Sequence, residues 1–120
     1  MRFALFAGLF LTSASFADNA LPPLSCEGHA PDWTLSLDHD EAQFIFGKTI
    51  EMTIPQRTQV RGAEFPKALT LIAQRDTAIV ILHQRQCDTE VVTAYPYEVN
   101  ILTQKGEEPV ILRGCCTKTQ

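Results

Sequence analysis

Four cysteines carry the most defined chemistry in this chain, and they stand at positions 26, 87, 115 and 116. In an oxidising compartment an even number of cysteines usually forms disulfides, whereas in the cytosol the same residues would hold a metal or react in redox chemistry. Zinc sites bring C-x-x-C pairs or alternating cysteine and histidine, and neither spacing occurs here. The pattern therefore predicts two structural disulfides among Cys26, Cys87, Cys115 and Cys116.

The adjacent pair Cys115 and Cys116 limits how these bonds can form. Neighbouring Cα atoms lie about 3.8 Å apart, closer than the roughly 4.4–6.8 Å that relaxed disulfides prefer. On a strand the two side chains would point to opposite faces, so each could reach a distant partner, either Cys26 or Cys87. Closing loops of about 90 and 29 residues would stabilise the fold by roughly 4.6 and 3.5 kcal/mol in the chain-entropy model.

Histidines and carboxylates gather in the first third of the chain. A divalent metal could be bound by His29, Asp32, His39 and Asp40. A glycosidase pair could come from Asp32, Asp38, Asp40 and Glu41. Nothing in the spacing forces either set to converge, so we expect solvated loop and rim residues.

Other catalytic signatures are missing from the sequence. It contains no nucleophile elbow, no H-E-x-x-H segment and no Gly-rich phosphate loop. His83 ends an apolar run, which predicts a hydrogen-bonded histidine at a strand end. We therefore predict no enzyme, no cofactor and no metal.

Three aromatic residues, Trp33, Tyr95 and Tyr97, could form a platform for sugars or peptides. The alternative is that all three occupy inward positions of strands and fill the core. Their spacing matches the buried face of strands, which favours the core.

The elements that would position these residues are strands. Apolar and polar residues alternate over 33–38, 50–54 and 95–101, and a short aromatic strand at 44–46 stops at Gly47. Residues 77–82 form a continuous apolar run, typical of a strand buried on both faces. Residues 105–109 predict a hairpin turn, and Pro96 must lie at an edge, a bulge or a rim.

Residues 67–75 fit either a strand or a helical turn, and the neighbouring strands favour a strand. Turns recur about every ten residues without a long helical pattern. The sequence thus predicts an all-β domain, a small antiparallel β-barrel or sandwich-like meander of about seven or eight strands tied by two disulfides.

The first residues are typical of a secretory signal peptide. Arg2 precedes an apolar run over 3–11, and small residues lead to a cleavage site near Ala17. Nine apolar residues are too few for a membrane span, which needs roughly 20. The expected organisation is a signal peptide over 1–17, an extended lead-in over 18–25 and a single β domain over 26–120, secreted or periplasmic.

The net charge of the chain limits which classes of partner it could bind. Removing 17 of the 120 residues leaves 103, enough for one domain. The leader holds one of the ten basic residues and none of the acidic ones, so the net charge moves from −4 to −5. This balance argues against nucleic acid or an anionic membrane surface and favours basic partners.

Two segments carry a resemblance to a known family. Residues 26–35 read CEGHAPDWTL, and Cys87 is followed by Tyr95-Pro96-Tyr97 and Gly114-Cys115. These segments resemble the C-x-G-x-E-P-F-W-x-L opening and the C, Y-P-Y, G-C closing pattern of a family of small uncharacterised bacterial periplasmic proteins. Ala30 and Asp32 stand where that family has Glu and Phe. The resemblance implies a secreted β-rich domain and brings no reaction with it.

Together these observations predict an exported, non-catalytic binding or structural module of the cell envelope. It would be a monomer whose partner is an envelope protein or a glycan. The alternative is a proteinaceous inhibitor of an exported hydrolase such as a lysozyme, because a rigid acidic barrel suits a basic enzyme cleft.

Overall fold

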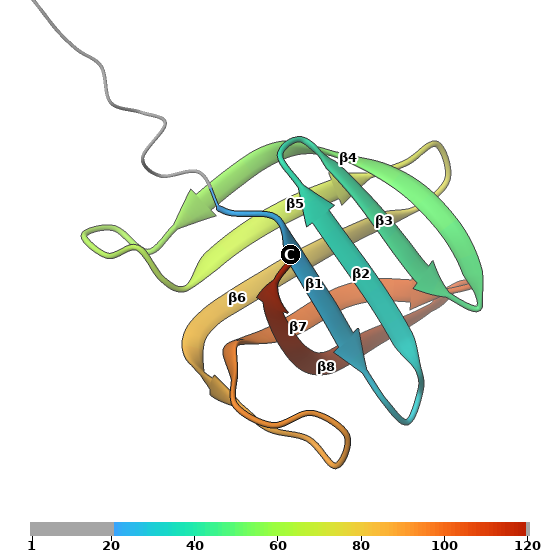
Figure 1. The fold of residues 1–120 in the computed structure, drawn as a ribbon. Coiled ribbons are helices and arrows are strands. Elements are labelled where there is room, and N and C mark those ends of the chain that lie inside the picture. Colours follow the sequence, from blue (N-terminus) through green and yellow to red (C-terminus); the bar gives the residue numbers. More distant parts are fainter. Residues whose placement is uncertain (1–20, 120) are drawn as a thin grey trace, which may run out of the picture.

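A computed structural model describes residues 21–119 of the chain. Eight antiparallel strands close into a barrel in which each strand pairs with the next and β8 pairs with β1 (Figure 1). The predicted all-β barrel with two disulfides is confirmed. The strands are β1 (Leu24–Gly28), β2 (Trp33–Asp38), β3 (Glu41–Phe46), β4 (Lys48–Gln59), β5 (Lys67–Ile72), β6 (Thr77–Cys87), β7 (Tyr95–Lys105) and β8 (Glu108–Lys118).

Part of the predicted organisation lies outside the described residues. This applies to the signal peptide over 1–17, its cleavage site near Ala17 and the first residues of the lead-in. Across residues 21–119, no helix has the length and apolarity that a membrane span requires.

The alternation of apolar and polar residues forms the barrel because successive side chains of a strand point to opposite faces. In β2 the side chains of Trp33, Leu35 and Leu37 are buried, and the residues between them are exposed. Most buried residues of the other strands join them in one apolar core inside the barrel, whereas Cys87 and Cys115 belong to a second, smaller cluster.

One strand differs from its prediction. The run 77–82 was expected to be buried on both faces, but Ile79 in β6 is 42% exposed. A closed barrel has a single interior, and only the inward residues of β6, such as Val80, are buried there. Ile79 lies in register with Leu102 of β7, which in turn pairs with Ile111 of β8. These three residues form an exposed apolar row on the outer surface.

Two other local predictions are confirmed, and the predicted end of the lead-in is shifted. The ambiguous segment contains strand β5, which confirms the preference for a strand. Pro96 lies in β7 opposite the irregular register between Gln84 and Cys87, so a bulge accommodates its missing N–H, as predicted. The lead-in ends two residues earlier than expected because Leu24 already pairs with both Leu37 and Lys118 and is fully buried.

The adjacent cysteines do point to opposite faces. Cys116 faces the interior and bonds to Cys26 on the neighbouring strand β1, with Cα atoms 4.0 Å apart. Cys115 faces outward and bonds to Cys87 at the end of β6, with Cα atoms 5.6 Å apart. The first bond closes the barrel at the seam between its first and last strands, and the second attaches the β6–β7 loop to the outer wall.

Two glycines beside this seam make room for the tryptophan. A Cβ atom on Gly114 would lie 2.1 Å from the carbonyl oxygen of Glu27 and 2.6 Å from the Trp33 ring. A Cβ atom on Gly28 would lie 2.1 Å from Nε1 of Trp33. Any side chain at either position would therefore displace the Trp33 ring or the backbone of β1.

Candidate functional site

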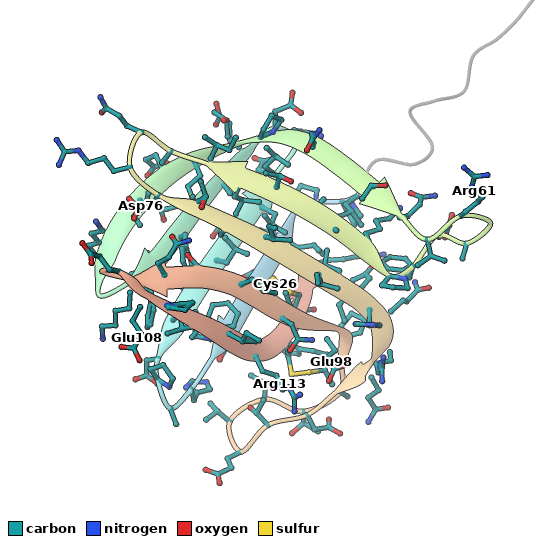
Figure 2. The ribbon with its side chains drawn as sticks, turned by 180° about the vertical axis from the view of Figure 1, so that it is seen from behind. Cys26, Arg61, Asp76, Glu98, Glu108 and Arg113 are labelled. Carbon is teal, nitrogen blue, oxygen red and sulfur yellow. A yellow bond between two sulfur atoms is a disulfide. The ribbon has the colours of Figure 1, made fainter. Side chains whose placement is uncertain are left out.

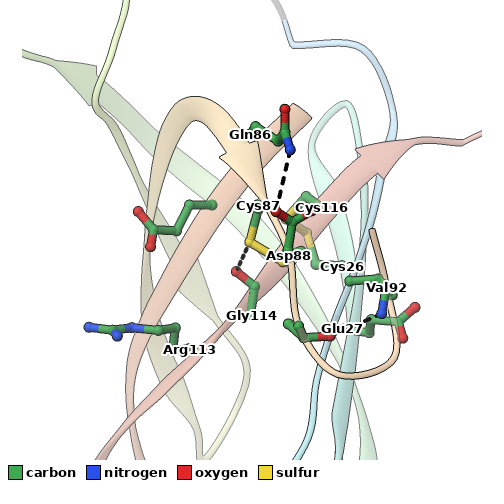
Figure 3. The surroundings of a disulfide bond; sticks show 12 residues. Cys26, Glu27, Gln86, Cys87, Asp88, Val92, Arg113, Gly114 and Cys116 are labelled. Atoms are coloured by element: carbon green, nitrogen blue, oxygen red, sulfur yellow. Dashed lines mark hydrogen bonds between the residues drawn. A yellow bond between two sulfur atoms is a disulfide. The ribbon is translucent and has the colours of Figure 1, made fainter. Parts of the chain in front are cut away.

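A groove of about 570 Å³ lies over the outer disulfide. The turn between β1 and β2 forms one wall, the β6–β7 loop forms the other, and β7 and β8 contribute the base. Cys87 and Gly114 line it, and Cys87 Sγ lies 3.3 Å from the Gly114 carbonyl oxygen (Figure 3). We call this concavity the disulfide groove.

The β6–β7 loop is held in place by its own side chains. The Thr89 hydroxyl accepts hydrogen bonds from the backbone N–H groups of Val91 and Val92 at 3.1 and 3.0 Å. Asp88 Oδ1 accepts one from the backbone N–H of Ala94. Val92 is buried against Cys87 and Cys115, so an apolar contact and a covalent bond join the loop to the barrel. The groove wall is thereby preorganised.

The groove is acidic. Three carboxylates line it against one guanidinium, which leaves a net charge of −2 when His29 is neutral. Glu98 is paired with Arg85 at 3.2 Å, and Arg113 Nε donates to Asn100 Oδ1 at 3.5 Å. Figure 2 shows Glu98 and Arg113 beside the disulfide on the outer wall. The charged lining residues are Asp88, Glu90, Glu98, Arg113 and His29.

His29 stands at the rim between two carboxylates. Its Nε2 lies 3.1 Å from Glu27 Oε2, and its Nδ1 lies 3.2 Å from Asp32 Oδ1. The hydrogen bond to Glu27, helped by Asp32, raises the pKa of His29 above 6.5, although desolvation acts in the opposite direction. His29 is therefore the group through which the charge of the groove can respond to mildly acidic pH.

The structure separates the candidate metal ligands. His29 and Asp32 share the β1–β2 turn, whereas His39 and Asp40 lie in the β2–β3 turn at the other end of β2. There Asp40 pairs with Arg57 at 3.3 Å. All four residues are exposed, which confirms the prediction that they are solvated loop residues. Within residues 21–119, no group of three or more histidine, cysteine, aspartate or glutamate side chains could hold a metal.

The carboxylates considered for glycoside hydrolysis are divided in the same way. Asp32 directly precedes β2, whereas the other three lie at or beyond its far end, and the six residues of this strand span about 20 Å. A glycosidase needs its two carboxyl groups within about 5 to 9.5 Å of each other. Asp32 therefore cannot pair with Asp38, Asp40 or Glu41.

The three candidate platform residues do not share a surface. Trp33 and Tyr97 are 3% and 5% exposed and belong to the core. Tyr95 is half-buried against the outer disulfide, outside the barrel interior. The expectation that Tyr95 also faces inward is wrong, because Tyr95 packs against Cys87, Val92 and Cys115 and not in the main core.

His83 also differs from its prediction. Strand β6 continues to Cys87, so His83 lies inside the strand, where it faces Glu98 of β7. Its Nδ1 is buried and has no hydrogen-bond partner within the described part of the chain. The expected hydrogen-bonded strand end is therefore wrong.

Sequence reasoning missed a second concavity at one end of the barrel. It has a volume of about 410 Å³ and is lined by Phe44, Phe46 and three cationic side chains, Lys48, Arg75 and Lys105. We call it the cationic mouth. A signal was present: each cation stands at a turn that joins an odd-numbered strand to the next one, and in an up-and-down barrel such turns share one end.

The structure brings the resembling segments together. Cys26 bonds to Cys116, and Gly28 and Gly114 both contact the Trp33 ring position. These opening and closing residues therefore form one structural unit at the barrel seam. Comparisons of the chain with protein-family models, curated proteins and solved structures returned no match, so the family resemblance stays a prediction.

Proposed function

We propose that this protein is an exported, non-catalytic binding module of the bacterial cell envelope, and that its disulfide groove contacts a basic partner. The signal-peptide pattern in the sequence supports export. The two disulfides are compatible with an oxidising compartment.

The observation that carries the proposal is the acidic lining of a groove whose walls are fixed. Three carboxylates and one guanidinium line the groove, and the outer disulfide holds the wall that carries Asp88 and Glu90. A preorganised surface loses little conformational entropy on binding. Complementary charge then selects the partner and accelerates association. A basic protein fits this surface better than a neutral glycan does.

Inhibition of an exported hydrolase is the second candidate, and the same acidity favours it. The β6–β7 loop projects from the barrel and could enter a basic enzyme cleft (Figure 1). The two candidates differ in outcome, because an inhibitor blocks turnover whereas a simple binding module leaves it unchanged.

The test uses the mature oxidised protein and a lysozyme as a basic probe, followed by a panel of envelope hydrolases. We expect micromolar binding by calorimetry that weakens as salt rises, since the groove acts through charge. Glu90→Lys should weaken binding by about tenfold. Glu64→Lys, an exposed carboxylate in the β4–β5 turn, is the matched control and should have little effect.

Measuring inhibition together with binding distinguishes the two candidate functions. Binding with inhibition supports the inhibitor, and binding without inhibition supports the module. If no basic protein in the panel binds, or if both charge reversals weaken binding equally, the role assigned to the groove is wrong.

A further inference from the structure

The two ends of the barrel differ. At the end where β2 meets β3, the cavity beneath Leu21 and Pro22 holds only about 30 Å³. At the opposite end the cationic mouth offers about 410 Å³. Figure 2 shows Asp76 and Glu108 at the side of the mouth and Arg61 at the far end. Of these two end cavities, the mouth has the size of a small-molecule site, typically about 300–1,000 Å³, and the other does not.

The base of the mouth is apolar and continuous with the core. Phe44 is 2% exposed, and the half-buried rings and chains of Phe46 and Ile50 pack against the same core. The Phe44 and Phe46 rings lie 6.1 Å apart. Phe44 is almost fully buried, so a ligand entering here would meet the half-buried side chains of Phe46 and Ile50, which favour an apolar body.

The rim of the mouth is cationic, although the chain as a whole is acidic. Lys48 Nζ lies 3.7 Å from Asp76 Oδ2, so this cation is already paired. Arg75 and Lys105 have no ion pair within residues 21–119. The lining therefore carries a net charge of +2 on a chain of net charge −4.

One contact joins the rim to the base. Lys105 Nζ lies 5.1 Å from the centroid of the Phe46 ring. A cation over an aromatic face stays close to that face. Lys105 therefore lies where the charged group of a ligand would meet its apolar part.

We propose that the cationic mouth binds a small anionic amphiphile. Its apolar body, an acyl chain or an aromatic ring, lies on Phe46 and Ile50 above the buried Phe44, and its carboxylate or phosphate is held by Arg75 and Lys105. A free anion would leave the aromatic base unused, and a neutral apolar ligand would leave the two cations without a counter-charge. This site is separate from the disulfide groove, and the proposal does not depend on the function assigned to that groove.

The experiment follows the fluorescence of Trp33, the single tryptophan of the chain. Its ring lies 6.4 Å from Phe44, which lines the mouth, so a bound ligand should change its emission. The probes are octanoate and octyl phosphate, with octyltrimethylammonium and inorganic phosphate for comparison. We expect saturable binding of both octyl anions, at least tenfold weaker binding of the octyl cation and no saturation by inorganic phosphate.

A pair of matched variants tests the rim. Arg75→Glu with Lys105→Glu should weaken octanoate binding at least tenfold. Arg61→Glu with Lys118→Glu makes the same charge change at the other end of the barrel, on two exposed residues, and should leave binding unchanged. Circular dichroism establishes that both variants are folded.

Three results would overturn the site. The first is equal affinity for the octyl anions and the octyl cation, which would show non-specific apolar adsorption. The second is equal loss of binding in the two charge-reversed variants. The third is saturation by inorganic phosphate as tight as that by octyl phosphate, which would show that the aromatic base takes no part.

Discussion

The disulfide groove and the cationic mouth are both concave and both built at hairpin turns, but they have opposite charge and different bases. The groove lies outside the barrel wall, where the base consists of the outer disulfide and of polar residues of β7 and β8. The mouth lies at an open end of the barrel, where the core itself forms the base. In a small barrel, the outer wall thus offers polar recognition and the open end offers apolar contact.

The two regions also differ in what holds them. The groove needs a loop that the Cys87–Cys115 bond and the buried Val92 side chain attach to the barrel, while hydrogen bonds within the loop fix its shape. The mouth is formed by three turns that follow directly from the strand pairing. Perturbations of the loop should therefore affect the groove alone, and perturbations of the seam should affect both.

The largest expected effect comes from removing the disulfides. Replacing Cys26 and Cys116 with alanine opens a loop of 90 residues and should cost about 4 to 5 kcal/mol of unfolding free energy. Replacing Cys87 and Cys115 opens 28 residues and should cost about 3 to 4 kcal/mol. Urea unfolding followed by Trp33 fluorescence measures both.

The second pair of replacements also tests the difference between the regions. The variant without Cys87 and Cys115 should no longer bind the basic probe. It should still bind octanoate at urea concentrations too low to unfold it. Retention of the basic probe by the variant without Cys87–Cys115 would show that the groove does not need its covalent wall.

An intermediate effect is expected at the seam. Gly114→Ala places a Cβ atom against Glu27 and Trp33, and such overpacking should cost about 1–3 kcal/mol. Gly114 lines the groove, and Trp33 packs against Phe44 of the mouth. Both binding activities should therefore weaken. Ser36→Ala, at an exposed position of β2, is the control for thermal stability. An unchanged melting temperature for Gly114→Ala would mean that Trp33 is not held as tightly as described.

The smallest effect is a dependence on pH. The pKa of His29 is raised above 6.5 by Glu27 and Asp32, so His29 gains a proton as pH falls through that raised value. The lining charge of the groove then moves from −2 to −1, and binding of the basic probe should weaken a few-fold.

Protonation of His29 stabilises the folded state, although it weakens binding of the basic probe. A folded pKa above the unfolded one favours the folded state below about pH 6.5, and this contribution is lost as pH rises through the folded pKa. It is small because His29 is exposed. His29→Gln should flatten the pH profile of the basic probe just above pH 6.5, where the raised pKa of His29 lies. Among the residues that line the mouth there is no histidine, so octanoate affinity should not change over that range. A profile that His29→Gln leaves intact would assign the pH response to another group.

Strands and pairing faces could be read from the sequence because they depend on local patterns. The alternation of buried and exposed residues in β2 follows directly from the period of two along a strand. The same period predicts that the adjacent Cys115 and Cys116 point to opposite faces. The exposure of Ile79 could not be read, since a continuous apolar run looks alike in a double-sided sheet and in a barrel wall. Tyr95 was misplaced because the outer disulfide against which it packs joins residues far apart in the sequence.

The residue types alone determined the one-sided strands, the need for two disulfides and the scattering of the loop histidines, since each of these depends on neighbours along the chain. Closure of the barrel decided the rest. It joined β1 to β8, chose Cys26 as the partner of Cys116, and brought Lys48, Arg75 and Lys105 to one end from turns far apart in sequence. These are long-range contacts, and only the tilt and register of the closed sheet determine which turns meet.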